Sequence, residues 1–110
     1  GLNLCVTFAL GSAELTPKAK ANLDQFAAAI GGGEFTTLKF AIEGHADASG
    51  SDPKNRELSA QRAESVTNYM VSKGVARDRL TFAGFGSERP VTGQAPTAAV
   101  NRRVEARLVR

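Results

Sequence analysis

The chain has 110 residues, of which 42% are hydrophobic and 23% charged, and its net charge is +3 at pH 7. This length and composition predict one globular domain, residues 1–110, with a single modest core and no apolar run long enough to span a bilayer. The first residues alternate between apolar and polar types, which is not typical of a signal peptide. Because the pattern begins abruptly within a strand, we expect one domain of a longer protein.

Strand and helix periodicities alternate in the first half of the chain. Residues 2–10 have period two, which predicts a strand with one buried face. Cys5 lies on the opposite face of this strand, where we expect it to pack as a small residue against a helix. Thr16 and Pro17 predict a helix start, the following apolar residues recur at helical spacing, and three glycines end the helix. Residues 37–43 then predict a second strand.

The second half of the chain predicts three further elements. Asp52-Pro53 breaks the chain, and the elements that follow are a helix over 55–73, a short strand from Leu80 that ends at Gly84-Phe85-Gly86, and a final strand over 103–109. The order β-α-β-α-β-β predicts an α/β fold, a two-layer sandwich with one mixed sheet and both main helices on one face.

One charged residue interrupts the apolar face of the second predicted helix. Arg62 falls within a stripe formed by Leu58, Ala63, Val66, Tyr69 and Met70. A buried guanidinium keeps its charge and needs an acceptor or a carboxylate, which Asp47, in the polar run 44–50 after the second strand, could provide. The two could form a plain ion pair. They could also form a receptor for a zwitterion, because a carboxylate binds an ammonium and the arginine fork binds a carboxylate.

Two polar side chains lie near this pair in the predicted helix. Asn55, at the predicted start, could cap the helix, bind a ligand at the same site, or do both. Ser59 shares the inward face of the helix and is expected mainly to satisfy the local backbone.

Other arrangements of reactive residues are less favoured. His45 is the only histidine and has no further ligand at suitable spacing, so no metal is expected. A Cys5–His45 nucleophilic pair lacks an orienting group. A Glu43–Asp47 acid/base pair is disfavoured because Glu43 alternates away along the strand and a nearby arginine would keep Asp47 ionised. No catalytic residue and no cofactor are therefore expected.

Much of the positive charge lies at the end of the chain, in Arg102, Arg103, Arg107 and Arg110. A solvated basic strand is favoured over a nucleic-acid surface, because there is no Trp and aromatic residues for base stacking are few. Nucleic acid is therefore not an expected partner. The single cysteine cannot form an internal disulfide, which leaves the redox compartment open.

Four motifs resemble one protein family. In chain order they are the run from Ile42 to Gly50, the run from Asn55 to Ala63, Gly84-Phe85-Gly86 with Pro90, and the run from Asn101 to Glu105; residues 8–15 are also similar. Over almost the whole chain these motifs resemble the OmpA-like C-terminal domain family, which includes the Pal lipoproteins and the periplasmic part of the MotB stator proteins. The resemblance implies the same fold and a binding module that is not an enzyme.

The resemblance also implies non-covalent binding of peptidoglycan through the diaminopimelate residue of its stem peptide. The ligand-binding positions that it implies are Asp47, Arg62, Asn55, Leu58, Ala46, Ser12 and Arg103. Asp47 would bind the diaminopimelate ammonium and Arg62 its carboxylate. The family commonly has threonine where this chain has Ala46, so one hydroxyl hydrogen bond, worth about 1 kcal/mol, would be missing.

The implied setting is the periplasm, in association with the outer membrane or cell envelope, where the domain would anchor a membrane-associated protein to the cell wall. Membrane attachment would come only from regions outside this chain, and a homodimer is compatible with such a module. The alternative is a structural module for dimerisation or partner docking, in which Asp47 and Arg62 form only an internal ion pair.

Overall fold

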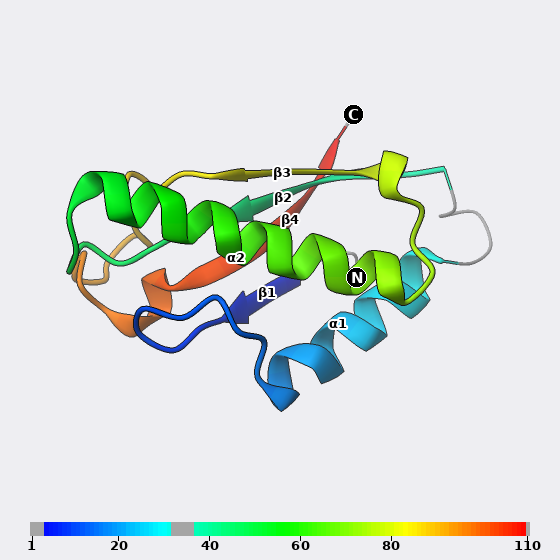
Figure 1. The fold of residues 1–110 in the computed structure, drawn as a ribbon, viewed down its shortest axis with the longest axis horizontal. Helices are drawn as coiled ribbons and strands as arrows, with labels where there is room; N and C mark the ends of the chain where they lie inside the picture. Colours follow the sequence, from blue (N-terminus) through cyan, green and yellow to red (C-terminus); the bar gives the residue numbers. More distant parts are fainter. Residues whose placement is uncertain (1–3, 32–36, 110) are drawn as a thin grey trace.

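Four strands form one mixed sheet in the computed structural model, which describes residues 4–31 and 37–109. The elements, shown in Figure 1, are β1 (Leu4–Thr7), α1 (Pro17–Ile30), β2 (Lys39–Gly44), α2 (Asp52–Ser72), the short 3₁₀ helix η2 (Arg77–Arg79), β3 (Leu80–Gly84), the short 3₁₀ helix η3 (Ala99–Asn101) and β4 (Arg103–Val109). The strand order is β1-β4-β2-β3. Strand β4 is antiparallel to both β1 and β2, and β3 is parallel to β2. The predicted α/β class and element order are confirmed.

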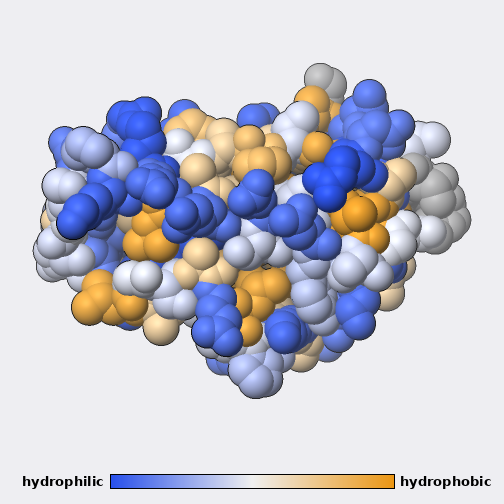
Figure 2. All heavy atoms as spheres, in the orientation of Figure 1, coloured by the Kyte–Doolittle hydropathy of each residue, from blue (hydrophilic) through white to orange (hydrophobic). Residues whose placement is uncertain are grey.

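One apolar core joins both helices to the same face of the sheet. Its buried residues include Leu4 and Val6 of β1, Phe40 and Ile42 of β2, Val104 of β4, Leu23, Phe26 and Ile30 of α1, and Ala63, Val66 and Met70 of α2. Within a strand these residues are two apart, as one buried face requires. Hydrophilic residues predominate along the outer side of α2 and separate smaller hydrophobic patches (Figure 2). No helix in the described ranges is long and apolar enough to cross a membrane.

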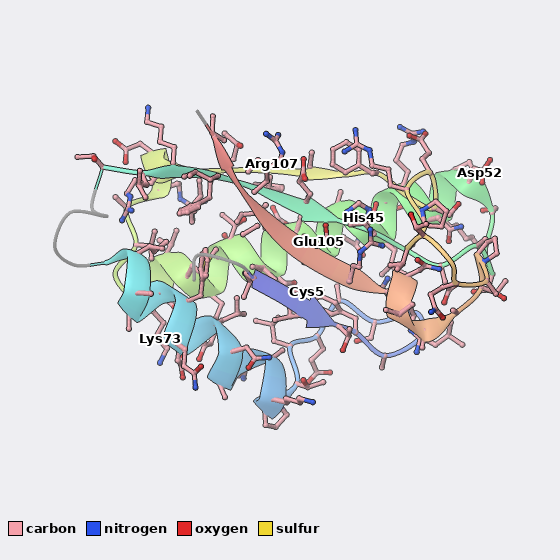
Figure 3. All side chains as sticks on the ribbon, turned by 180° about the vertical axis from the view of Figure 1, so that it is seen from behind. Cys5, His45, Asp52, Lys73, Glu105 and Arg107 are labelled. Atoms are coloured by element: carbon pink, nitrogen blue, oxygen red, sulfur yellow. The ribbon has the colours of Figure 1, made fainter. Side chains whose placement is uncertain are left out.

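The opposite face of the sheet carries no helix, and this changes the expectation for Cys5. Figure 3 shows Cys5, Glu105 and Arg107 on this uncovered side. Cys5 is exposed, so the prediction that it packs against a helix was wrong: both helices cover the other face. Burial and the charge of Glu105 raise the pKa of the Cys5 thiol, against the opposing effect of Arg103. A thiol whose pKa is raised is a weak nucleophile at neutral pH.

The first strand is shorter than its alternating pattern suggested. β1 ends at Thr7, Phe8 is still buried, but Leu10 is 68% exposed. The chain turns here: the amide of Ser12 donates to the carbonyl of Ala9 at 3.1 Å, and Gly11 has a positive φ of 68°. Leu10 therefore lies on a loop and not on the buried face of a strand. Residue 2, the predicted first position of the strand, lies outside the described residues.

The start of α1 agrees with the capping prediction, and the start of α2 corrects it. Thr16 caps α1 as predicted, since its side chain accepts a hydrogen bond from the amide of Ala19. Helix α2 begins at Asp52 with Ser51 at the cap position, so Asp52-Pro53 is not a break before it. Proline fits the first helical turn because the amide it lacks would have no partner there. Asn55 consequently lies inside the helix and is not its cap.

Two glycines allow α2 to approach the ends of β2 and β3 closely. A Cβ at Gly44 would lie 1.9 Å from the carbonyl oxygen of Ser59, and one at Gly84 would lie 2.3 Å from the amide nitrogen of Ala60. Neither position can hold a larger residue unless the helix moves. This close contact positions Arg62, three residues after Ser59, against the loop that follows β2.

Candidate binding pocket

A pocket of about 400 Å³ opens where loops from three parts of the chain meet α2. Its walls come from the loop after β1, the loop after β2, the first turns of α2, and the residue before β4. In Figure 1 these loops lie together at one end of the molecule, on the left. The lining residues are Leu10, Gly11, Ala46, Asp47, Ser49, Gly50, Lys54, Asn55, Leu58, Arg62 and Arg102.

Arg62 belongs to the pocket wall, although its side chain exposes essentially no surface. Its Nε donates to the carbonyl oxygen of Ser12 at 2.8 Å, its Nη1 to that of His45 at 3.1 Å, and its Nη2 to that of Ala9 at 3.1 Å. An arginine has five N–H donors, so these three backbone bonds leave two N–H groups, one on each terminal nitrogen. The predicted need of the guanidinium for acceptors is therefore met by main-chain carbonyls.

A second arginine makes this part of the pocket strongly cationic. Burial lowers the pKa of Arg62 to about 10, and the nearby charge of Arg102 acts in the same direction, while Asp47 opposes both. The guanidinium therefore remains charged at neutral pH. Two like charges that face one pocket favour the entry of an anion, which relieves their mutual repulsion.

Asp47 lies at the start of the loop after β2 and is held by its neighbours. It is 4% exposed. One carboxylate oxygen, Oδ1, accepts hydrogen bonds from the amide of Ser49 at 2.9 Å and from the Ser49 hydroxyl. The other, Oδ2, accepts from Nη1 of Arg102 at 3.1 Å. Burial raises the pKa of Asp47, but the hydrogen bonds from Ser49 and the Arg102 contact outweigh it and hold this pKa below its usual value. The carboxylate is therefore ionised and fixed in orientation.

Asp47 and Arg62 line the same pocket but are not paired with each other. The ion-pair partner of Asp47 in the described structure is Arg102, 55 residues away in the chain. Arg62 has backbone partners instead. An internal Asp47–Arg62 ion pair, on which the structural-module alternative depended, is therefore wrong for this structure. Asp47 and Arg62 are therefore an anionic and a cationic group of the pocket that are separately supported.

Three other predicted positions also belong to the pocket wall: Ala46, Asn55 and Leu58. Asn55 is 6% exposed, and its side-chain amide donates to the carbonyl of Gly50 at 3.2 Å, which ties the loop to the helix. Leu58 is half-buried and adds an apolar surface. Ser59, by contrast, is fully buried: its hydroxyl donates to the local carbonyl of Arg56, as predicted, and also accepts from the distant amide of Gly86.

The family of the chain follows from comparison with known proteins. A family model described as the OmpA family matches residues 7–103. The chain belongs to the OmpA family. OmpA-like domains are peptidoglycan-binding modules without enzymatic activity.

Relatives and solved structures agree with this assignment. The chain is 46% identical over 92 residues to outer membrane protein P5 of Haemophilus influenzae, a match that covers 84% of this chain and 26% of P5. It thus spans about a quarter of that relative. The OmpA-like domain of FopA1 from Francisella tularensis matches with a TM-score of 0.89 at 25% identity, over 98% of this chain and 75% of that one. The peptidoglycan-associated lipoprotein from Burkholderia pseudomallei matches with a TM-score of 0.86 at 26% identity, over 96% and 89%.

Two of the positions implied by the OmpA resemblance do not line the pocket of this domain. Ser12 takes part through its main chain, whose carbonyl accepts from Arg62, while its hydroxyl accepts from the amide of Glu14 at 3.0 Å. Arg103 points elsewhere: its Nε donates to Glu105 at 2.6 Å and its Nη2 to the carbonyl of Arg89 at 3.0 Å. Ser12 thus supports the site from behind in this OmpA-family structure, whereas the Arg103 side chain contacts residues outside the pocket.

The C-terminal arginines form the solvated basic strand that the sequence predicted only in part: Arg107 is exposed, whereas Arg102 is half-buried and Arg103 is buried. Arg102 pairs with Asp47, Arg103 with Glu105, and Arg107 with Glu43. Arg103 is only 6% exposed, and its Nη2 donates to the carbonyl of Arg89 in the connection after β3. Arg110 lies outside the described residues. Arg102 is the pocket residue that sequence reasoning missed, although it stands in the Asn101–Glu105 motif; Leu10 and Lys54 carried no signal in the sequence.

His45 supports the same site from its buried side. It is 3% exposed, its ring stacks on Phe85 with centroids 5.7 Å apart, and its carbonyl accepts from Arg62. The Nδ1 atom has no hydrogen-bond partner in the described part of the chain. Burial, with the charge of Arg103, lowers the pKa of His45 to about 4, and Glu105 and Glu43 oppose this only in part. The fold therefore requires a neutral imidazole.

We expect the domain to lose stability as the pH falls from 7 to 5. The pKa of His45 is near 6.5 in the unfolded chain and about 4 in the folded chain. Between pH 7 and 5 the unfolded state therefore binds a proton that the folded state does not, and this favours unfolding. The expected loss in free energy of unfolding is about 1–2 kcal/mol. Urea unfolding of the wild type and of His45→Gln at both pH values measures it. The variant should lose clearly less than the wild type, and parallel losses would contradict this role of His45.

Proposed function

We propose that this domain binds peptidoglycan non-covalently through the diaminopimelate residue of the stem peptide, as a periplasmic anchor to the cell wall. The observation that carries the proposal is the pocket itself, in which Asp47 and Arg62 are both present, both charged and not neutralised by each other. Membership of the OmpA family supports the ligand class. Attachment to a membrane would depend on parts of the protein outside this chain.

The distal end of diaminopimelate offers an ammonium and a carboxylate on one carbon. The two remaining N–H groups of Arg62 would bind the carboxylate. Asp47 accepts three hydrogen bonds, and a carboxylate has about four acceptor positions, so it can still receive the ammonium. Leu58 and Leu10 would pack against the methylene groups of the ligand, and Asn55 would hold the loop in place. One chain supplies the whole lining, so a second copy is not required.

Titration of two matched tripeptides tests the proposal. One carries diaminopimelate at its third position, and the other carries lysine, which keeps the ammonium and lacks the distal carboxylate. We expect binding of the first, and weaker binding of the second by about 1.5–3 kcal/mol, the value of a hydrogen bond to a charged group. Isothermal titration calorimetry measures both affinities. Equal affinities, or no binding of the diaminopimelate peptide, would overturn the proposal.

A further inference from the structure

The pocket contains more positive charge than a diaminopimelate head group can balance. Three cationic side chains line it, Lys54, Arg62 and Arg102, against the single carboxylate of Asp47. That carboxylate already pairs with Arg102. The head group adds one ammonium and one carboxylate, so its net charge is zero and the excess remains. A pocket of this composition favours a ligand with more carboxylates than ammonium groups.

Of the three cationic side chains in the pocket wall, Arg62 is bound by backbone carbonyls and Arg102 by Asp47, which leaves Lys54. It lies in the first turns of α2, is exposed, and makes no hydrogen bond or ion pair with any other residue that the structure describes. Lys73, by contrast, is a lysine whose ammonium is engaged, since it pairs with Asp24 at 3.6 Å. The nearby Asp52 lines a separate depression together with Arg56 and Glu88. The ammonium of Lys54 is therefore available at the pocket wall.

We infer that Lys54 binds a second carboxylate of the stem peptide, next to the head group held by Asp47 and Arg62. The inference rests on the proposed function. Two carboxylates have this chemistry: the free α-carboxylate of the glutamate that precedes diaminopimelate, and the C-terminal carboxylate of the peptide. The compact charge of lysine on a flexible four-carbon chain suits a group that is not fixed in one geometry. Lys54 thereby makes recognition sensitive to amidation of the peptide.

Calorimetric titration at low ionic strength, where exposed charge pairs are least screened, tests the inference. The ligands are the tripeptide with both carboxylates free, the same peptide with the glutamate α-carboxylate amidated, and the same peptide with its C-terminus amidated. Wild type should bind one of the two amides about three- to fivefold more weakly than the free acid. Lys54→Gln should bind the free acid about as weakly and should not distinguish it from that amide. The amide that matters identifies the carboxylate.

Lys20→Gln is the matched control, because Lys20 is exposed on α1 and lies outside the pocket. It should behave as the wild type with all three peptides. If Lys54→Gln keeps the wild-type preference for the free acid over both amides, or if the wild type has no such preference, the inference is overturned while the proposed function stands. If the wild type binds none of the peptides, the proposed function fails and the inference falls with it.

Discussion

Asp47→Asn is expected to remove most peptidoglycan binding and to leave the fold intact. The amide has nearly the same shape and can still accept the hydrogen bond from the Ser49 amide, so the loop keeps its main support. Asparagine lacks the negative charge of Asp47. In the wild type this charge pairs with Arg102, and it would hold the ligand ammonium. The expected loss is about 1.5–3 kcal/mol, roughly 10- to 100-fold in affinity for the diaminopimelate tripeptide. Calorimetry measures the affinity and circular dichroism the fold.

Asp78→Asn provides the control for this change. Asp78 is an exposed aspartate in η2 and does not line the pocket. The Asp78→Asn substitution makes the same change in net charge, so any general electrostatic effect on an anionic ligand would appear in both variants. Affinity should fall only for Asp47→Asn. Wild-type affinity in a folded Asp47→Asn protein would remove Asp47 from the binding site.

Arg62→Ala is expected to destabilise the domain severely as well as to abolish binding. The substitution removes the Arg62 donor from the carbonyls of Ser12 and His45, removes one of the two donors to the carbonyl of Ala9, and opens a cavity beside the Phe8 ring. The guanidinium is fully buried and its contact with His45 is buried, so losing its hydrogen bonds and its packing is costly, and the expected loss in free energy of unfolding is about 3–5 kcal/mol. For a domain of this size that corresponds to a fall in Tm of roughly 15–30 °C, which differential scanning calorimetry measures.

Two further variants separate hydrogen bonding from charge at this position. Arg62→Lys keeps the charge but cannot reach three carbonyls with one ammonium, so we expect it to lose most of the same stability. Arg56→Ala removes an arginine from the same helix whose exposed ion pair with Glu88 is worth less than about 1 kcal/mol. If the Tm of Arg62→Ala equals that of Arg56→Ala, the backbone contacts of Arg62 contribute little to stability.

Together these two expectations change how the site should be probed. A receptor pair open to solvent would lose binding with little loss of stability at either residue. The structure separates the two positions, because Asp47 is a loop residue held mainly by its immediate neighbours, whereas Arg62 joins three segments of main chain. Loss of binding in Arg62→Ala cannot therefore be interpreted without its stability, and Asp47→Asn is the cleaner test of ligand recognition.

Local pattern was sufficient for the elements and for two of the charged residues of the pocket, Asp47 and Arg62. Period-two and helical spacing predicted the strands and helices in their observed order, because burial of one face imposes that spacing on the chain itself. Arg62 stood out within an apolar stripe, and Asp47 stood out in a polar loop after a buried strand. These are properties of neighbouring residues, so a sequence contains them directly.

The partners of those residues were decided only by the tertiary structure. Asp47 meets Arg102 across 55 positions, and Arg62 reaches the carbonyl of Ala9 across 53. Spacing along the chain gives no information on such contacts, since they depend on which strand lies beside which and on how closely α2 approaches the sheet. The same reason explains Cys5, whose exposure follows from both helices covering one face, and Leu10, which a turn moves from a predicted strand to the pocket wall. Secondary structure follows from local burial patterns, but the charge balance of the pocket arises where distant segments meet.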